Sequence, residues 1–161
     1  MQEVEKKVEK SSTKEEARVK RVLVAVDGSE NAMKAVKIAS IIAKDNSAEL
    51  TILHVMAIPV AAYSGDVAFP VDKIEDEARR QGEKFLESAT TTAERAGIKP
   101  RTAIVESMNS PVRGITDYSE KNMIDLIVVG TRGLGSFKRL LLGSVASGVV
   151  HYAHCSVLVI R

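Results

Sequence analysis

The sequence contains no tryptophan, only three phenylalanines and three tyrosines, and no large excess of charge of one sign. Its 23 Lys and Arg residues nearly balance 21 Asp and Glu residues, which gives a formal net charge of +2. Proteins that bind nucleic acid typically carry a basic stripe, often with aromatic side chains on which bases stack. Neither feature is present, so nucleic acid is not expected as the main partner.

Cysteine and long apolar runs are also scarce. Cys155 is the single cysteine, which excludes an intramolecular disulfide, and no Cys/His set has the spacing of a zinc site. No segment approaches the roughly 18 apolar residues of a membrane helix, and the N-terminus carries Glu and Lys residues instead of an apolar signal core. The sequence therefore predicts a soluble, cytoplasmic protein that does not contact a membrane.

The apolar residues that are present suffice for one core. With 161 residues, 45% of them apolar, the chain suits a single compact domain. Residues 1–19 differ, because acids alternate with bases and Val4 and Val8 are almost the only apolar side chains. We interpret this segment as a charged N-terminal extension, either a solvated tail or an arm that docks a partner, and residues 20–161 as the domain.

Five apolar segments alternate with four helical patterns along this domain. The expected strands are 21–26, 49–55, 101–105, 124–129 and 156–160. The expected helices lie at about 29–46, 72–96, 110–122 and 143–152, and a long connection is expected over 56–71. Such alternation is typical of an α/β fold, in which helices cover both faces of a parallel sheet. Gly97 is expected to end the second helix, and Ser110-Pro111 to begin the third.

A glycine-rich segment follows the fourth expected strand. Gly130 and Gly133 come directly after this strand, and Gly143-Ser144 stands at the start of the next expected helix. Glycine can adopt positive φ, and because it has no side chain its backbone N–H group can approach an anion closely. The free N–H groups of a helix N-terminus also favour negative charge. The segment therefore predicts a phosphate site, the alternative being a strand end followed by an ordinary turn.

The spacing of these glycines also resembles a known motif. Gly130, two residues, Gly133, nine residues and then Gly143-Ser144 is the pattern of the ATP-binding branch of the universal stress proteins. The resemblance extends over about residues 19–161, because further segments resemble the first, second and last strands of that family. These segments are 22–29, 52–55 and 157–160.

The resemblance implies a fold. It implies a Rossmann-like, adenine nucleotide alpha hydrolase-like domain, which is a doubly wound five-stranded parallel sheet. We expect the strand order 3-2-1-4-5, on this resemblance and on the general rule that ligands bind beyond the carboxyl ends of the strands where the winding reverses. Asp27 and Gly130 stand at the two strand ends in question. In this chain His154 and Ser156 flank Cys155 where many family members have proline, which leaves open how the chain enters the last strand.

The resemblance also implies ligands and the residues that hold them. The protein would bind ATP or another adenine nucleotide and form a homodimer through the last strand, residues 157–160. Backbone groups of Val55 and of Ala25 or Val26 would hold adenine, and Val129 would flank the ribose or base. The implied contacts on the phosphate side are Gly130, Gly133, Gly143, Ser144, Val145 and Ser156.

Charged residues near this site have two interpretations each. Asp27 either approaches a Mg²⁺ or Mn²⁺ ion on the triphosphate, directly or through water, or shares the N-cap of the first helix with Ser29; both roles can coexist. Arg132, Lys138 and Arg139 either lean over the phosphates or remain in solvent. An acid at position 27 also argues against a flavodoxin-type site, where the turn after the first strand must accept a phosphate.

The remaining chemically active side chains have structural interpretations. His54 alternates with apolar residues in a strand and is expected to be a hydrogen-bonded core histidine. His151 and His154 are interpreted as residues at a helix C-terminus, and Cys155 as a small buried apolar residue.

We expect an ATP-binding regulatory module of the stress response, with no catalytic residues assigned. The sequence has no Gly-x-x-x-x-Gly-Lys-Ser/Thr loop, no Gly-x-Gly-x-x-Gly after its first strand and no obvious pair of carboxylates beside the phosphates. Two alternatives stay open. One is a slow ATPase or nucleotide hydrolase in which Asp27 holds the metal, and the other is a nucleotide-independent chaperone or scaffold. The sequence does not distinguish ATP from ADP, AMP or cyclic AMP.

Overall fold

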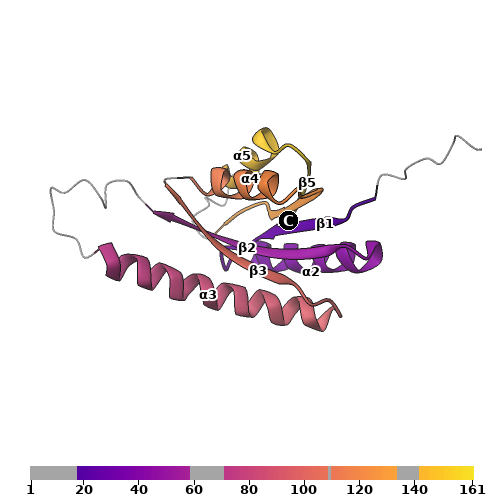
Figure 1. Cartoon of the computed structure of the whole chain (residues 1–161), viewed down its shortest axis with the longest axis horizontal. Coiled ribbons are helices and arrows are strands. Elements are labelled where there is room, and N and C mark those ends of the chain that lie inside the picture. The colour runs from indigo at the N-terminus through magenta and orange to yellow at the C-terminus, as the bar shows by residue number, and fades with distance from the viewer. Residues whose placement is uncertain (1–17, 59–70, 109, 134–141) are drawn as a thin grey trace, which may run out of the picture.

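The computed structural model describes residues 18–58, 71–108, 110–133 and 142–161. Strands and helices alternate along these residues (Figure 1). They are β1 (Arg21–Ala25), α2 (Glu30–Asn46), β2 (Glu49–Ile58), α3 (Val71–Arg95), β3 (Arg101–Met108), α4 (Pro111–Lys121), β4 (Leu126–Gly130), α5 (Ser144–Tyr152) and β5 (Ser156–Ile160). The strands form one parallel sheet in the order β3-β2-β1-β4-β5. The predicted fold class and strand order are confirmed.

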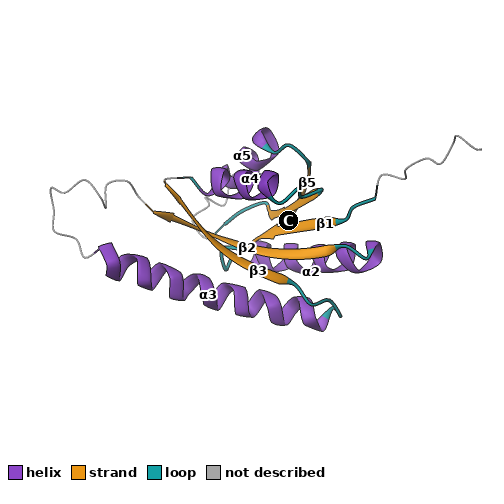
Figure 2. Ribbon diagram, viewed as in Figure 1, coloured by secondary structure: helices purple, strands orange, loops and turns teal. Residues whose placement is uncertain are grey.

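Helices cover both faces of the sheet. In Figure 2, α4 and α5 lie above the sheet, and α2 and α3 lie below it. Alternate residues of the central strands enter the two cores, so that Val24 packs toward α2 and α3 while Leu23 and Ile127 pack toward α4 and α5. All three side chains are fully buried. Burial on both faces explains why these strands are almost continuously apolar.

The two strands at one side of the sheet are longer than predicted. β2 continues past Val55 to Ile58, and β3 continues past Val105 to Met108. The extra residues pair with each other in parallel register, as Ile58 with Met108. Met56 is buried, whereas Ala57 and Met108 are exposed, so backbone pairing holds the last residues of the two strands. The predicted connection over 56–71 is therefore too long at its start, and residues 59–70 lie outside the described residues.

Helix ends follow the predicted chemistry. The Ser29 hydroxyl caps α2 by accepting a hydrogen bond from the Ala32 N–H at 3.2 Å. Ser110 caps α4, with Pro111 in the first turn. Gly97 follows α3 with φ of +84°, a conformation that favours glycine. Each of these residues fixes where a helix begins or ends.

Two further predictions meet the limits of the described residues. The proposed N-terminal extension, residues 1–19, falls almost entirely outside them. Among the helices that are described, none combines the length and the apolar character needed to cross a membrane.

Candidate functional site

A cavity of about 520 Å³ opens at the carboxyl ends of β1, β2 and β4. Its volume is in the range of small-molecule sites. It lies where the winding of the sheet reverses between β1 and β4, as expected for an open α/β sheet. Most of the residues predicted for the site line this cavity. They are Ala25, Val26, Asp27, Val55, Val129, Gly130, Arg132, Gly133, Gly143, Ser144 and Val145.

Ser156 is the predicted residue that the structure does not bring to the cavity. It begins β5, where it pairs with Leu126 at the amino end of β4, and it is exposed. In a parallel sheet the amino ends of the strands lie at the edge opposite to the carboxyl ends. The prediction that Ser156 completes the phosphate side is therefore wrong.

The two halves of the glycine motif lie next to each other. The N–H of Gly143 donates to the carbonyl of Thr131 at 2.6 Å, and the N–H of Thr131 donates to the carbonyl of Ile160 at 2.7 Å. These bonds hold the start of α5 beside the end of β4. Residues 134–141, which include Lys138 and Arg139, lie outside the described residues.

Gly130 and Gly133 have close neighbours in the structure and do not use the positive φ that glycine allows. Among the described glycines, those with positive φ are Gly28 and Gly97, so neither motif glycine uses that freedom. Gly130 instead lies against the first turn of α2, where an added Cβ would be 2.8 Å from the backbone carbonyl carbon of Asn31. A Cβ on Gly133 would meet the Asp27 carboxylate. Backbone packing therefore opposes a side chain at Gly130, whereas at Gly133 only the end of the Asp27 side chain is in the way.

The first turn of α2 is tied to the loop after β4 by polar contacts. The Ser29 hydroxyl donates to the carbonyl of Arg132 at 3.3 Å, and the Asn31 amide donates to the Thr131 hydroxyl at 3.4 Å. Both side chains belong to α2 or its cap, so helix and loop are held as one unit. This arrangement places the helix N-terminus at the edge of the cavity.

Asp27 orients the cap of α2 without being the cap. Its Oδ1 accepts from the N–H of Ser29 at 3.0 Å, and Ser29 then caps the helix. Its carboxylate also lies directly beside Gly133, and both residues line the cavity. In the described part of the chain, no group of three or more His, Cys, Asp or Glu side chains is placed to hold a metal ion. A divalent cation here would depend on one carboxylate, the ligand's phosphates and water, as Mg²⁺ commonly does.

Sequence reasoning missed the side walls of the cavity. One wall comes from His54 of β2 with Gln81 and Phe85 of α3, and the other from Pro111 and Ile115 of α4. The available signal was spacing, because the two residues of each helix are four positions apart and so share a helix face. Only the packing of these helices beside the strand ends shows that the face lines a cavity.

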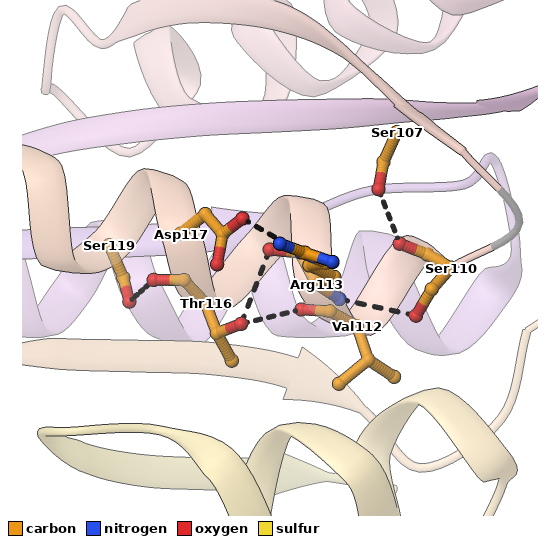
Figure 3. A network of polar contacts seen from close by, with 7 residues as sticks. All are labelled: Ser107, Ser110, Val112, Arg113, Thr116, Asp117 and Ser119. Carbon is orange, nitrogen blue, oxygen red and sulfur yellow. Dashed lines mark hydrogen bonds and ion pairs between the residues drawn. The ribbon is translucent and has the colours of Figure 1, made fainter.

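The α4 wall is held close to the sheet. The Ser107 hydroxyl, at the end of β3, donates to the carbonyl of Ser110 at 2.8 Å, and the Ser110 hydroxyl accepts from the N–H of Arg113 (Figure 3). Gly114 is buried, and a Cβ there would be 2.5 Å from a methyl group of Val55. The first turn of α4 therefore sits directly over the ends of β2 and β3.

His54 is hydrogen-bonded, as predicted, but it also lines the cavity. Its Nδ1 donates to the carbonyl of Val26 at 2.8 Å, and its ring meets Phe85 edge-on with the centroids 5.5 Å apart. The N–H of Val26 donates to the carbonyl of Leu53 at 2.8 Å. Both backbone groups of Val26 therefore take part in hydrogen bonds.

The other predicted histidines and the cysteine lie away from the cavity. His151 is in the last turn of α5, and His154, beyond that helix, has its Nδ1 3.4 Å from the Ser119 hydroxyl. Burial raises the pKa of the half-buried Cys155 thiol, and the nearby Asp125 carboxylate raises it further. A raised pKa disfavours the reactive thiolate, which agrees with the structural interpretation of Cys155.

Comparison with known proteins gives a consistent result. The model of the universal stress protein family matches residues 18–161. The chain is 35% identical over 147 residues to universal stress protein YxiE of Bacillus subtilis, a match that covers 88% of this chain and 98% of the relative. The solved structure of universal stress protein UspA from Lactobacillus plantarum is similar with a TM-score of 0.72 and 29% identity, over 89% of this chain and 99% of the other. A universal stress protein solved in complex with cAMP is similar with a TM-score of 0.61 and 25% identity, over 89% of this chain and 98% of the other.

Proposed function

This chain belongs to the universal stress protein family, and from that premise we propose that it is a regulatory protein whose cavity binds ATP or a related adenine nucleotide. In this proposal the bound nucleotide sets the state that partner molecules recognise. A related protein of the family was solved with cAMP, which supports an adenine nucleotide as the ligand class. The single cysteine of the chain is consistent with a cytoplasmic location, which we include in the proposal.

The observation that carries this proposal is the glycine cradle at one end of the cavity. We use this name for Gly130, Gly133, Gly143 and Ser144, which line the cavity together. A Cβ at either of the first two positions would clash with α2 or Asp27. The N-terminus of α5 adjoins them, and the Gly143 cap provides no side-chain hydrogen bond to its free N–H groups. Such an arrangement suits phosphate oxygens.

We include a divalent cation in the proposal, with Asp27 as its protein ligand. A carboxylate beside a phosphate site would repel the phosphates unless a cation lay between them. The Asp27 side chain lines the same cavity as the glycine cradle, so a cation carried by the triphosphate could reach it. Mg²⁺ or Mn²⁺ would then neutralise both groups.

The proposal also includes a homodimer formed through β5. Within the described residues β5 pairs with β4 on one side and leaves its other edge open. An open apolar edge favours pairing with a second copy. The helices that contact β5 add exposed apolar side chains, namely Ile41 of α2 and Val150 and Tyr152 of α5. A two-fold interface could cover the edge and these side chains together.

Native mass spectrometry tests the nucleotide proposal. The purified protein would be titrated with ATP, ADP, AMP and cyclic AMP, with CTP as a control of equal charge to ATP. We expect stoichiometric binding of at least one adenine nucleotide and much weaker binding of CTP. Equal binding of CTP would contradict recognition of adenine, and binding of none would favour the nucleotide-independent scaffold.

A further inference from the structure

The cavity has a second polar end that the glycine cradle does not explain. The cradle follows β4, whereas His54 lies near the end of β2, and β1 lies between these two strands. Neighbouring strands are roughly 4.8 Å apart, so about 10 Å separates the two ends. A nucleotide with its phosphates on the cradle would direct its base toward β2 and α3. The side chains at that end would then contact the base.

Few side chains at the β2 and α3 end of the cavity can form hydrogen bonds. The polar side chains near the cradle come from the loops after β1 and β4 and from the start of α5. They are Asp27, Ser29, Thr131, Arg132 and Ser144. At the other end, the described cavity lining provides His54 and Gln81, beside the apolar ring of Phe85. Base atoms at this end that form no hydrogen bond with the protein backbone can therefore form one with His54 or Gln81.

The hydrogen bond to Val26 fixes the chemistry of His54. A backbone carbonyl only accepts hydrogen bonds, so the Nδ1 atom that lies 2.8 Å from it carries the proton. In the neutral imidazole the other nitrogen, Nε2, is then an acceptor. No hydrogen bond within the described residues involves Nε2. Adenine presents an amino donor at its 6-position, whereas guanine presents a carbonyl acceptor there.

Two glycines leave space for the His54 ring and for the Phe85 ring that packs against it. Gly82 of α3 is buried, and a Cβ there would be 2.5 Å from Cδ2 and 3.1 Å from Nε2 of His54, so this glycine leaves the space beside Nε2 open. Gly28 has φ of +82°, and a Cβ there would enter the Phe85 ring that meets His54 edge-on. The imidazole is therefore confined by two residues of α3, Gly82 and Phe85. A confined acceptor discriminates between ligands better than a mobile one.

We propose that His54 is a specificity-determining residue, whose Nε2 accepts a hydrogen bond from the 6-amino group of adenine. This inference rests on the proposed function, because it assumes that the phosphates occupy the glycine cradle. It assigns base selection to a side chain of β2, outside the glycine motif. Phe85 is the apolar support of that side chain, and Gln81 has no part in reading the 6-position.

The test compares ATP with purine riboside triphosphate, which has hydrogen in place of the 6-amino group. Calorimetry on the wild type should show ATP binding about threefold to tenfold more tightly, the value of one hydrogen bond. The key variant is His54→Asn, because an Asn amide nitrogen can take the place of Nδ1 and keep the bond to Val26 while Nε2 is lost. This variant should bind the two nucleotides equally.

Matched variants separate recognition from packing. Gln81→Ala should keep the preference for ATP, and Phe85→Leu should lower the affinity for both nucleotides by a similar factor. Equal affinities in the wild type, a preference that survives His54→Asn, or a preference lost in Gln81→Ala would each overturn the inference. The wild-type comparison applies even if a variant folds poorly. A wild type that binds neither nucleotide would overturn the proposed function and this inference with it, whereas tight but equal binding overturns the inference alone.

Discussion

Gly143 is the residue at which the proposed phosphate site can be blocked without disturbing the fold. Its φ of −70° and ψ of 160° are open to any residue, and it is buried at the start of α5 beside the cavity. A β-branched side chain there would fill the space in front of the helix N-terminus. We expect Gly143→Val to lower ATP affinity by about tenfold or more in calorimetry, with an unchanged circular dichroism spectrum.

A control substitution on the same helix makes this result specific. Ser147 lies one turn further along α5, is exposed and does not line the cavity. Ser147→Val introduces the same side chain and should leave ATP affinity within about twofold of the wild type. If Gly143→Val binds ATP as well as this control does, the cradle is not the phosphate site.

The charge of Asp27 can be separated from its structural role. Asp27→Asn keeps an oxygen that can accept from the Ser29 N–H, but it removes the negative charge that a divalent cation requires. We expect ATP affinity to fall about tenfold with Mg²⁺ present and by less than about twofold in EDTA. Equal losses in both buffers would mean that Asp27 serves only to orient the cap.

At the scale of elements, the close contact between α2 and the end of β4 gives a stability prediction. A Cβ at Gly130 would press on the backbone of Asn31, which cannot move away without shifting the helix. A Cβ at Gly133 would meet only the end of the Asp27 side chain, which can rotate. Gly130→Ala should therefore lower the free energy of unfolding by about 1–3 kcal/mol in urea titrations, and Gly133→Ala by less. The reverse order would contradict the described packing.

The elements were largely predictable because their signals are local. Apolar runs buried on both faces identified β1 and β4, and Ser29, Gly97 and Ser110 marked helix ends by their own backbone and capping chemistry. The ends of β2 and β3 were not predictable, because Ile58 and Met108 are held by pairing with each other across 50 residues of sequence. The sequence of one strand does not indicate where its partner strand ends.

The site was predictable to a similar degree and for the same reason. The residues of the glycine cradle lie within one short segment of the sequence, so their spacing was visible. Gln81, Phe85 and Ile115 reach the cavity only through helix packing, and their spacing marks a shared helix face but not the cavity that it lines. The prediction for Ser156 was wrong because the position of this residue depends on the direction in which β5 runs relative to the cavity. The close approach of Gly130 to α2 was not visible either, since its neighbour there is distant in sequence.

At the scale of the whole molecule, the free edge of β5 predicts how copies associate. The Ile160 carbonyl faces β4, because it accepts from the N–H of Thr131, so the alternate residue Val159 directs its backbone to the open edge. Val159→Pro should therefore remove a donor from the interface while the bonds to β4 remain. We expect light scattering to show a dimer for the wild type and a monomer for this variant.

The neighbouring residue provides the control for this experiment. The backbone of Leu158 faces β4 together with that of Ile160, so Leu158→Pro should break the sheet itself and lower the melting temperature strongly. Val159→Pro should melt at a clearly higher temperature than Leu158→Pro, because its bonds to β4 remain. A monomeric wild type, or a Val159→Pro variant that is still dimeric, would show that β5 does not form the interface.

The central claim is that an adenine nucleotide binds with its phosphates on the glycine cradle, and hydrogen exchange with and without saturating ATP tests it most directly. The claim predicts slower amide exchange in peptides that cover residues 129–133 and 143–147, with smaller protection near Ala25 and Val55. Amides near Ser156, at the opposite edge of the sheet, should exchange unchanged. Saturation with ATP that leaves exchange in 129–133 and 143–147 unaltered would contradict the claim.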